Sequence, residues 1–370
     1  MQRRAFFQTS LAAGLAGAGL AAVPSVAHAG ARRQSDSIRL SSNENPLGLG
    51  PKARQAVLDA LVDANRYPGA VRRPLIERLA SRHGVTEGAV VLGCGSTEVL
   101  RVAVHGLDAT RVVVANPTYE DVESYAGTLP ASVHAVPLRA DRSHDIPRMR
   151  ALADEADGPV VIFLCNPNNP TGTLTSSDEI DTWIAGAPDH HYFLVDEAYF
   201  HFVDDPSYHT AIPWVHRRAN VLVARTFSKV YGMAGLRLGY GVAHPDLAAR
   251  LNAWSTRNNG SYVACAAGLA SLTDPDFVEQ SLAVNRQART IARECLDDLG
   301  LTYFPSHTNF MMHEVRGDLD TYRDRMREHG ILVGRKFPPL LGHNRVSMGL
   351  PSEMDRWAET LRTFRKEGWV

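Results

Sequence analysis

Lys229 stands where its side-chain amine can take part in chemistry. It follows an apolar run at residues 221–224, ends the sequence Thr-Phe-Ser-Lys at residues 226–229, and precedes a glycine-spaced arginine, Arg237. A lysine amine can form a Schiff base with an aldehyde cofactor, while the Ser228 hydroxyl and a guanidinium hold a phosphate on the same molecule. These residue types indicate pyridoxal phosphate. A lone lysine on a loop is more often a solvated cation, so the rest of the chain must supply an acid for the pyridine nitrogen and a second phosphate cradle.

An acid for the pyridine nitrogen follows a second apolar run. Residues 192–195 read Tyr-Phe-Leu-Val and lead into Asp196, with Tyr199 three positions later. Because α/β proteins bind ligands at the carboxyl ends of their strands, we expect the Asp196 carboxylate to face such a crevice. There it can keep the ring nitrogen protonated, which makes the ring an electron sink, and Tyr199 can donate to the cofactor's phenolic oxygen. An aspartate that only caps a helix is the alternative.

Two further turns have the composition of cofactor loops. Residues 93–97 read Gly-Cys-Gly-Ser-Thr between a short apolar run and a helix-like stretch. Glycines allow a close approach of the backbone to a ligand, and free N–H groups at a helix N-terminus favour an anion, so this turn is a candidate phosphate cradle. It lacks both the Walker pattern and the spacing of a dinucleotide fold. Residues 165–172, Cys-Asn-Pro-Asn-Asn-Pro-Thr-Gly, form a second turn whose amides can bond the ring oxygen.

The chain resembles the fold-type I, class I/II aminotransferases, and among them most closely the histidinol-phosphate aminotransferases. The resemblance extends from about Arg39 to the C-terminus and depends on motifs that occur in the family's order. The motifs are Gly-Ser-Thr-Glu at residues 95–98, Asn-Asn-Pro-Thr-Gly at 168–172, Val-Asp-Glu-Ala-Tyr at 195–199, Thr-Phe-Ser-Lys at 226–229 with Ala-Gly-Leu-Arg at 234–237, and Arg-Val-Ser-Met-Gly at 345–349.

The resemblance implies a cofactor role for each matching residue. It makes Lys229 the Schiff-base lysine and proton shuttle, Asp196 the partner of the ring nitrogen, and Tyr119 the aromatic ring stacked on the cofactor. The residues that it places at pyridoxal phosphate are Gly95, Ser96, Thr97, Tyr119, Asn169, Asp196, Tyr199, Thr226, Ser228, Lys229 and Arg237. Tyr67 resembles a tyrosine that reaches the phosphate of the neighbouring subunit in a homodimer. A half-buried tyrosine before a turn is its alternative reading.

The resemblance also implies a substrate site and a reaction. Arg345 matches the arginine for the substrate α-carboxylate, which a planar guanidinium binds in a bidentate manner. Asn309 is expected to assist there, and Asn45, in the sequence Asn-Glu-Asn-Pro, belongs to the same substrate site. The expected reaction moves an amino group between an amino acid and a 2-oxo acid or related ketone. A pyridoxal phosphate-dependent decarboxylase or lyase on the same fold is the alternative.

Two departures from the family pattern bear on the substrate. Leu47 follows Asn-Glu-Asn-Pro where the family often has an aromatic residue. Gly334 displaces an expected arginine by one position to Arg335, and in an extended segment such a shift turns a side chain to the opposite face. The segment 336–341, which is apolar after Lys336, indicates a less anionic pocket. The substrate is therefore expected to be either histidinol phosphate or a non-phosphorylated amino acid.

Composition and patterning define the predicted class and fold. The formal net charge is −1 and the pI about 7.0, which favours neither nucleic acid nor a membrane surface as a partner. Cysteine spacing contains no CxxC, and no metal is predicted. We expect an α/β fold with a mostly parallel seven-stranded sheet in a large domain at residues 65–262. A smaller α+β domain is expected at residues 263–370, joined by an N-terminal arm at residues 30–64. The predicted strands are residues 90–92, 111–115, 133–137, 160–164, 192–195, 221–225 and 238–242.

The N-terminus has the features of an export signal. Arg3 and Arg4 precede paired phenylalanines, an Ala/Gly/Leu stretch covers residues 11–23, and Ala-His-Ala occupies residues 27–29. This order of charged, apolar and small residues predicts a twin-arginine signal at residues 1–29. The apolar stretch is too short and too rich in glycine for a stable transmembrane helix. We therefore expect a periplasmic or otherwise extracytoplasmic enzyme.

Overall fold

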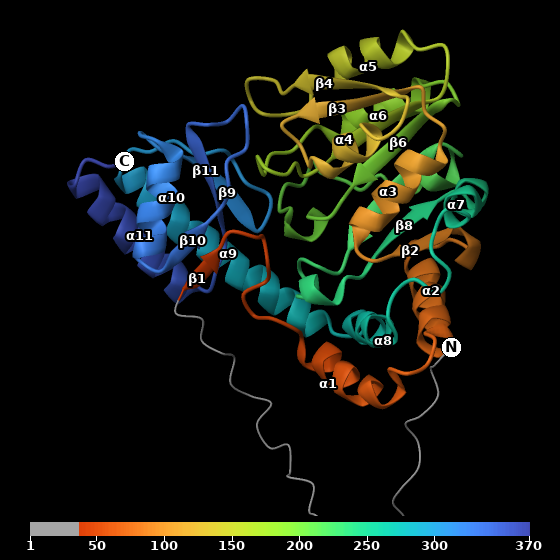
Figure 1. The fold of residues 1–370 in the computed structure, drawn as a ribbon, viewed down its shortest axis with the longest axis horizontal. Coiled ribbons are helices and arrows are strands. Elements are labelled where there is room, and N and C mark those ends of the chain that lie inside the picture. The colour runs from red at the N-terminus through yellow and green to blue at the C-terminus, as the bar shows by residue number, and fades with distance from the viewer. Residues whose placement is uncertain (1–36) are drawn as a thin grey trace, which may run out of the picture. The chain divides into compact units, whose positions relative to one another are not determined.

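The computed structural model describes residues 37–370 and is organised around a seven-stranded sheet (Figure 1). The strand order is β2-β8-β7-β6-β5-β3-β4. Neighbouring strands run parallel except at β8, which is antiparallel to both β2 and β7. The predicted mostly parallel seven-stranded sheet is thereby confirmed. Its strands are β2 (Val90–Gly93), β3 (Arg111–Asn116), β4 (Ser132–Pro137), β5 (Val160–Cys165), β6 (His191–Asp196), β7 (Val221–Thr226) and β8 (Gly239–Ala243).

Both faces of the sheet are buried because its central strands are continuous apolar runs. In β5, Val160, Ile162 and Leu164 pack into the core on one face. The intervening Val161 and Phe163 pack into the core on the other face. This alternation follows from the two-residue repeat of a strand, and burial on both faces is typical of a parallel sheet covered by helices.

Helices cover the two faces of this sheet. One core receives buried side chains from α3, α4 and α7, and the other from α1, α2, α5, α6 and α8. The domain boundaries at residues 64/65 and 262/263 stay a prediction. The helices are α1 (Pro51–Ala60), α2 (Gly69–His83), α3 (Ser96–Gly106), α4 (Asp121–Ala126), α5 (Ile146–Asp154), α6 (Ser177–Gly186), α7 (Pro245–Asn252) and α8 (Tyr262–Ser271), with 3-10 turns at η1 (Leu61–Asp63), η2 (Glu87–Ala89), η3 (Phe200–Phe202), η4 (Ile212–His216) and η5 (Ala234–Leu236).

A smaller α+β group of elements has a core of its own. In it β1 pairs in parallel with β10, and β9 pairs antiparallel with β11. Leu40, at the end of β1, is fully buried and pairs with Val333, so the first described segment packs within this group. The elements are β1 (Ile38–Leu40), α9 (Pro275–Asp298), β9 (Phe310–Glu314), α10 (Leu319–Glu328), β10 (Ile331–Val333), β11 (His343–Ser347) and α11 (Pro351–Lys366).

Within residues 37–370, no helix combines the length and the apolar character that a membrane crossing requires. The predicted export signal at residues 1–29 lies outside the described residues.

The carboxyl ends of the parallel strands lie along one edge of the large sheet. Because β8 is antiparallel to both of its neighbours, β2 runs in the same direction as β7. The loops that follow β2, β3, β5, β6 and β7 therefore open at the same edge, where α/β proteins bind ligands. These loops carry every motif that was predicted to contact the cofactor of the same chain; Tyr67, which was predicted to reach that of a neighbouring subunit, precedes α2.

Candidate active site

A cavity of about 330 Å³ lies at this edge of the sheet. Its volume falls within the roughly 300–1,000 Å³ of sites that bind small molecules. Most of the predicted site residues converge on it. Those that line the cavity are Ser96, Thr97, Tyr119, Asn169, Asp196, Tyr199, Thr226, Ser228, Lys229, Arg237 and Arg345.

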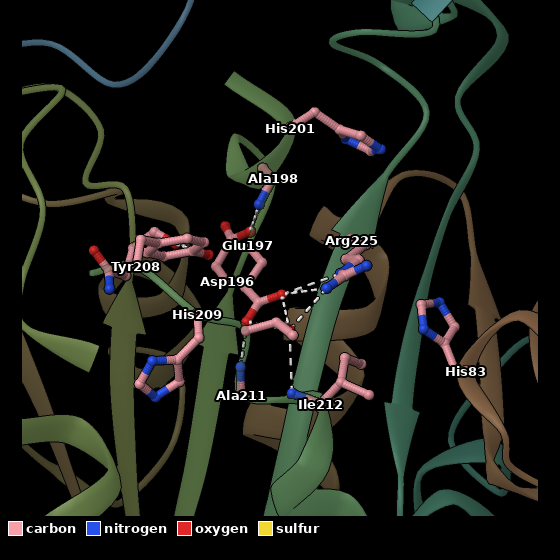
Figure 2. A network of polar contacts seen from close by, with 12 residues as sticks. His83, Asp196, Glu197, Ala198, His201, Tyr208, His209, Ala211, Ile212 and Arg225 are labelled. Atoms are coloured by element: carbon pink, nitrogen blue, oxygen red, sulfur yellow. Dashed lines mark hydrogen bonds and ion pairs between the residues drawn. The ribbon is translucent and has the colours of Figure 1, made fainter. Parts of the chain in front are cut away.

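Lys229 and Asp196 are two ionisable groups of opposite charge that line the cavity. The Lys229 amine donates a hydrogen bond to the Asn43 carbonyl at 3.3 Å, and burial lowers its pKa to about 8. The Asp196 carboxylate accepts a hydrogen bond from the Ala198 N–H at 3.0 Å (Figure 2), and burial raises its pKa to about 7. An amine with a lowered pKa is available as a base or nucleophile, and a buried carboxylate is stabilised by a cationic partner such as a protonated ring nitrogen.

The residue after Asp196 forms a buried ion pair that the sequence analysis did not identify. Glu197 accepts hydrogen bonds from the Arg225 guanidinium at 2.7 and 3.1 Å, and its side chain is 2% exposed (Figure 2). The Arg225 guanidinium also lies 3.6 Å from the Phe200 ring centroid. Because Asp196 ends β6 and Lys229 follows β7, this pair joins the two strands that carry the central groups of the cavity.

Replacing Glu197 with glutamine is expected to destabilise the fold, because it leaves the Arg225 charge buried without a counter-ion. Breaking a buried ion pair from one side costs about 3–5 kcal/mol. Chemical denaturation measures the change in the free energy of unfolding. The matched control is Glu77→Gln in the exposed Arg73–Glu77 pair, for which at most about 1 kcal/mol is expected. Equal changes in the two variants would contradict a buried, structurally important pair.

The loop between β2 and α3 has the geometry of a phosphate cradle. Gly95 has a φ of +80° and immediately precedes α3, whose first N–H groups favour an anion. A Cβ at Gly95 would lie 2.5 Å from the Arg237 guanidinium, so only glycine leaves room for that side chain. Arg237 donates to the Ala234 carbonyl at 3.0 Å and the Ser228 hydroxyl at 3.4 Å. Because these partners are neutral, its charge remains available to a phosphate.

The side chains predicted to contact the cofactor ring are held by their neighbours. The Tyr119 hydroxyl bonds to Thr97 at 2.9 Å and to Asp121 at 2.5 Å, which fixes the ring beside the cavity. The Tyr199 hydroxyl accepts a hydrogen bond from the Asn43 side chain at 3.1 Å, which leaves its own O–H free to donate. The Asn169 amide oxygen accepts from Arg345 at 2.6 Å, which leaves the Asn169 N–H groups as donors.

Arg345 provides a buried cation at the substrate end of the cavity. Its guanidinium donates to the Asn169 amide oxygen and to the Ser41 carbonyl at 3.2 Å, both neutral acceptors. Its buried Nε has no hydrogen-bond partner among the described residues. Burial lowers the pKa of Arg345 to about 10. A guanidinium with neutral partners and an unpartnered N–H is suited to bind a carboxylate.

Four predicted residues do not line the cavity of their own chain: Gly95, Tyr67, Asn309 and Asn45. Gly95 belongs to the loop described above, and Tyr67 is 82% exposed. Asn309 donates to the Asn43 carbonyl at 3.0 Å, and Asn45 donates to the Val230 carbonyl at 2.9 Å. Both asparagines therefore fix the backbone around the cavity.

Three neighbouring residues that were not predicted from the sequence also line the cavity. Ser42, Asn43 and Glu44 contribute to the cavity wall, and Asn43 bonds to both Lys229 and Tyr199. Asn43 and Glu44 belong to the Asn-Glu-Asn-Pro sequence from which Asn45 was selected, so the signal was present.

Arg335 lies in the cavity wall, so the expectation that its displacement turns it away is wrong. Strand β10 ends at Val333, and the Gly334 N–H donates to the Arg345 carbonyl at 2.9 Å. A Cβ at Gly334 would lie 2.4 Å from that carbonyl oxygen. Glycine thus permits a close approach of the two backbones, and the chain beyond it no longer follows the alternation of a strand. Arg335 pairs with Glu120 at 2.6 Å, a residue that no sequence signal distinguished.

The residues of the cavity fit pyridoxal phosphate. A cradle with an uncompensated arginine suits its phosphate, a buried carboxylate suits its ring nitrogen, and a buried lysine suits its aldehyde. In the part of the chain that the structure describes, no group of His, Cys, Asp and Glu side chains is arranged to hold a metal ion. The fold and the site together define an enzyme built around a phosphorylated aldehyde cofactor.

Comparisons with known proteins identify the family. A family model for aminotransferase class I and II matches residues 35–361. Histidinol-phosphate aminotransferase 1 of Nitrosococcus oceani is 34% identical over 345 residues, which cover 90% of this chain and 90% of that protein. The solved structure of a protein from Erwinia carotovora atroseptica has a TM-score of 0.88 and 38% identity, covering 90% of this chain and 97% of that one.

A second solved structure is that of histidinol-phosphate aminotransferase from Sinorhizobium meliloti in complex with pyridoxal-5'-phosphate. It has a TM-score of 0.82 and 26% identity, covering 90% of this chain and 91% of that one. The chain belongs to the class I and II aminotransferases.

Proposed function

We propose that this chain is a pyridoxal phosphate-dependent enzyme that moves an amino group between an amino acid and a 2-oxo acid or related ketone. The observation that carries the proposal is the convergence of Lys229, Asp196, Arg237 and Arg345 on one cavity. Each supplies a different requirement of the reaction: a reactive amine, an acid for the ring nitrogen, a phosphate ligand and a carboxylate ligand.

The protein groups have separable tasks. When bound, pyridoxal phosphate supplies a conjugated ring that withdraws electrons from the carbon next to the substrate nitrogen. Asp196 would hold the proton on the ring nitrogen, and Arg237 with the N–H groups of α3 would bind the phosphate. Arg345 would fix the substrate carboxylate. The Lys229 amine, with its lowered pKa, would remove the proton from the substrate α-carbon and return it to the cofactor carbon bonded to the same nitrogen.

The names of the relatives make histidinol phosphate one candidate amino donor, and a non-phosphorylated amino acid is the other. A decarboxylase or lyase would use the same cofactor-binding residues, so transfer must be tested directly. The protein is incubated with a ¹⁵N-labelled amino donor and an unlabelled 2-oxo acid, and the products are analysed by mass spectrometry. We expect the label in the newly formed amino acid. Labelled ammonia or released CO₂ in its place would contradict the proposal.

We propose a homodimer in which Tyr67 reaches the cofactor phosphate of the partner subunit. Tyr67 is 82% exposed and lies outside the cavity of its own chain, and the nearby Leu61 and Val62 are 56% and 82% exposed. Adjacent exposed apolar side chains of this kind mark interaction surfaces. Sedimentation equilibrium tests the assembly: twice the chain mass is expected, and a monomer at all concentrations would contradict it.

We also propose export by the twin-arginine route, which carries folded proteins and suits an enzyme that acquires its cofactor before export. The support is the order of Arg3, Arg4, the apolar stretch at residues 11–23 and the small residues at 27–29. Replacing both arginines with lysine, which keeps the charge, is expected to retain the enzyme in the cytoplasm. Fractionation with immunodetection measures this. Unchanged extracytoplasmic accumulation of the Arg3→Lys/Arg4→Lys variant would exclude the twin-arginine route.

A further inference from the structure

The arginines of the cavity differ in whether their charge is already compensated. Three of them line it: Arg237, Arg335 and Arg345. Arg237 and Arg345 donate only to neutral oxygens. Arg335 pairs with the Glu120 carboxylate at 2.6 Å. Arg237 lies at the phosphate cradle, so Arg345 is the one uncompensated guanidinium at the substrate end of the cavity.

Arg335 and Arg345 line the same cavity and contact the same aromatic ring. The two guanidiniums lie 4.2 and 4.5 Å from the centroid of a single ring, that of Phe337. After burial and Tyr199, the charges that act on the pKa of Arg345 are those of Arg335, which lowers it, and Glu120, which raises it. These residues therefore form one electrostatic unit at the wall of the cavity.

Apart from Arg345, the arginines near Arg335 are also paired with carboxylates. A second cavity of about 480 Å³ shares Arg335 and Arg345 and is also lined by Arg323 and Arg327 of α10. Each of these α10 arginines pairs with an aspartate on its own helix: Arg323 with Asp320 at 3.2 Å, and Arg327 with Asp324 at 2.6 Å. Apart from Arg237 at the phosphate cradle, Arg345 is thus the one described arginine of the two cavities without an acidic partner.

We propose that Glu120 is a specificity-determining residue that favours substrates carrying an α-carboxylate over those carrying a phosphate ester in its place. A carboxylate has a single negative charge and fits one guanidinium in a bidentate manner. A phosphate monoester carries about −1.5 to −2 charges and three acceptor oxygens, so it gains from a second cation. Arg335 pairs with Glu120 in a partly exposed ion pair, with side chains 49% and 61% exposed, and the Glu120 charge repels the ester. This inference rests on the proposed function and assigns its substrate class: α-amino acids.

The test compares two donors in the holoenzyme and in its Glu120→Gln variant, which keeps the shape of the side chain and removes its charge. L-Histidine and histidinol phosphate share an imidazole side chain. L-Histidine carries an α-carboxylate where histidinol phosphate carries a phosphate ester. In the wild type, kcat/KM is expected to favour L-histidine. In the variant, the ratio of kcat/KM for histidinol phosphate over that for L-histidine is expected to rise by up to about fivefold, the range for an exposed ion pair. An unchanged ratio would overturn the proposal.

Two control variants separate this effect from a general change at the site. Adding Arg335→Gln to Glu120→Gln is expected to abolish the gain, because the released guanidinium causes it. Glu123→Gln removes an exposed carboxylate from the same helix region without touching the cavity and is expected to leave the donor ratio unchanged. A gain that persists without Arg335, or that also appears in Glu123→Gln, would contradict the role of the pair.

A binding measurement keeps the proposal distinct from the proposed function. The holoenzymes are titrated with methyl phosphate and with acetate, and the change in cofactor absorbance reports binding. Glu120→Gln is expected to strengthen the binding of methyl phosphate relative to that of acetate by up to about fivefold. If no donor is converted by either protein, the proposed function fails, while this titration still decides whether Glu120 excludes the phosphate. An equal change for both anions would refute the inference.

Discussion

Replacing Lys229 with alanine is expected to abolish the covalent link to the cofactor and to lower turnover by about 10²–10⁴-fold, the range that a positioned general base contributes. Lys229 is half-buried just beyond the carboxyl end of β7 and lines the same cavity as Asp196. Burial lowers its pKa to about 8, which places a reactive amine where the cofactor aldehyde must lie. No other lysine of the described chain lines this cavity.

The link is measured by reducing the holoenzyme with borohydride and determining the mass of the intact chain. The wild type is expected to gain one reduced cofactor per chain, and Lys229→Ala none. Lys336→Ala serves as the matched control, because Lys336 follows Arg335 in sequence but lies outside the cavity lining. A cofactor mass fixed to the Lys229→Ala chain would show that another amine forms the link.

Replacing Asp196 with asparagine is expected to lower turnover by about 10²–10³-fold, comparable with removing one preorganised electrostatic contact in other enzymes. Asparagine keeps the shape and the bond from the Ala198 N–H but cannot hold a proton on the ring nitrogen. Cofactor binding is expected to survive in part, because the phosphate ligands are unchanged.

Steady-state turnover and cofactor absorbance of the purified variant measure these two effects separately. Asp189→Asn is the control, since Asp189 has a fully exposed side chain in a surface pair with Arg218. Near-normal turnover in Asp196→Asn would remove the electron-sink role from this carboxylate.

The sequence predicted the sheet and the cofactor end of the cavity because both depend on local patterns. Continuous apolar runs such as residues 160–165 specify strands that are buried on both faces. Each chemical motif follows such a run directly, so the direction of the strand decides where the motif lies. Asp196 and Lys229 could therefore be assigned to one edge of the sheet before the structure was known.

The substrate end was less predictable because its geometry depends on contacts between distant segments. Glu120 follows β3, whereas its partner Arg335 follows β10, and no local pattern relates them. Asn43 and Asn45 belong to one motif, so the sequence did not distinguish them. Only the fold shows that it is the Asn43 side chain that bonds to Tyr199. The position of Arg335 required the close backbone contact at Gly334.

The Glu197–Arg225 pair illustrates a second limit of sequence patterns. Glu197 lies within a motif assigned to the cofactor and Arg225 directly precedes another, so their charges suggested no separate role. Only the register of β6 and β7 brings the carboxylate and the guanidinium together in the buried layer next to the cavity. A polar pair of this kind is specified by three-dimensional packing, which periodicity does not encode.

The central claim, that this cavity binds pyridoxal phosphate and transfers an amino group, is tested most directly by a single half-reaction. The purified holoenzyme is mixed with an amino donor in the absence of an acceptor, and absorbance and product mass are followed together. The account predicts one equivalent of pyridoxamine phosphate and one equivalent of keto acid per chain. Release of CO₂ or ammonia while the cofactor stays in its aldehyde form would contradict it.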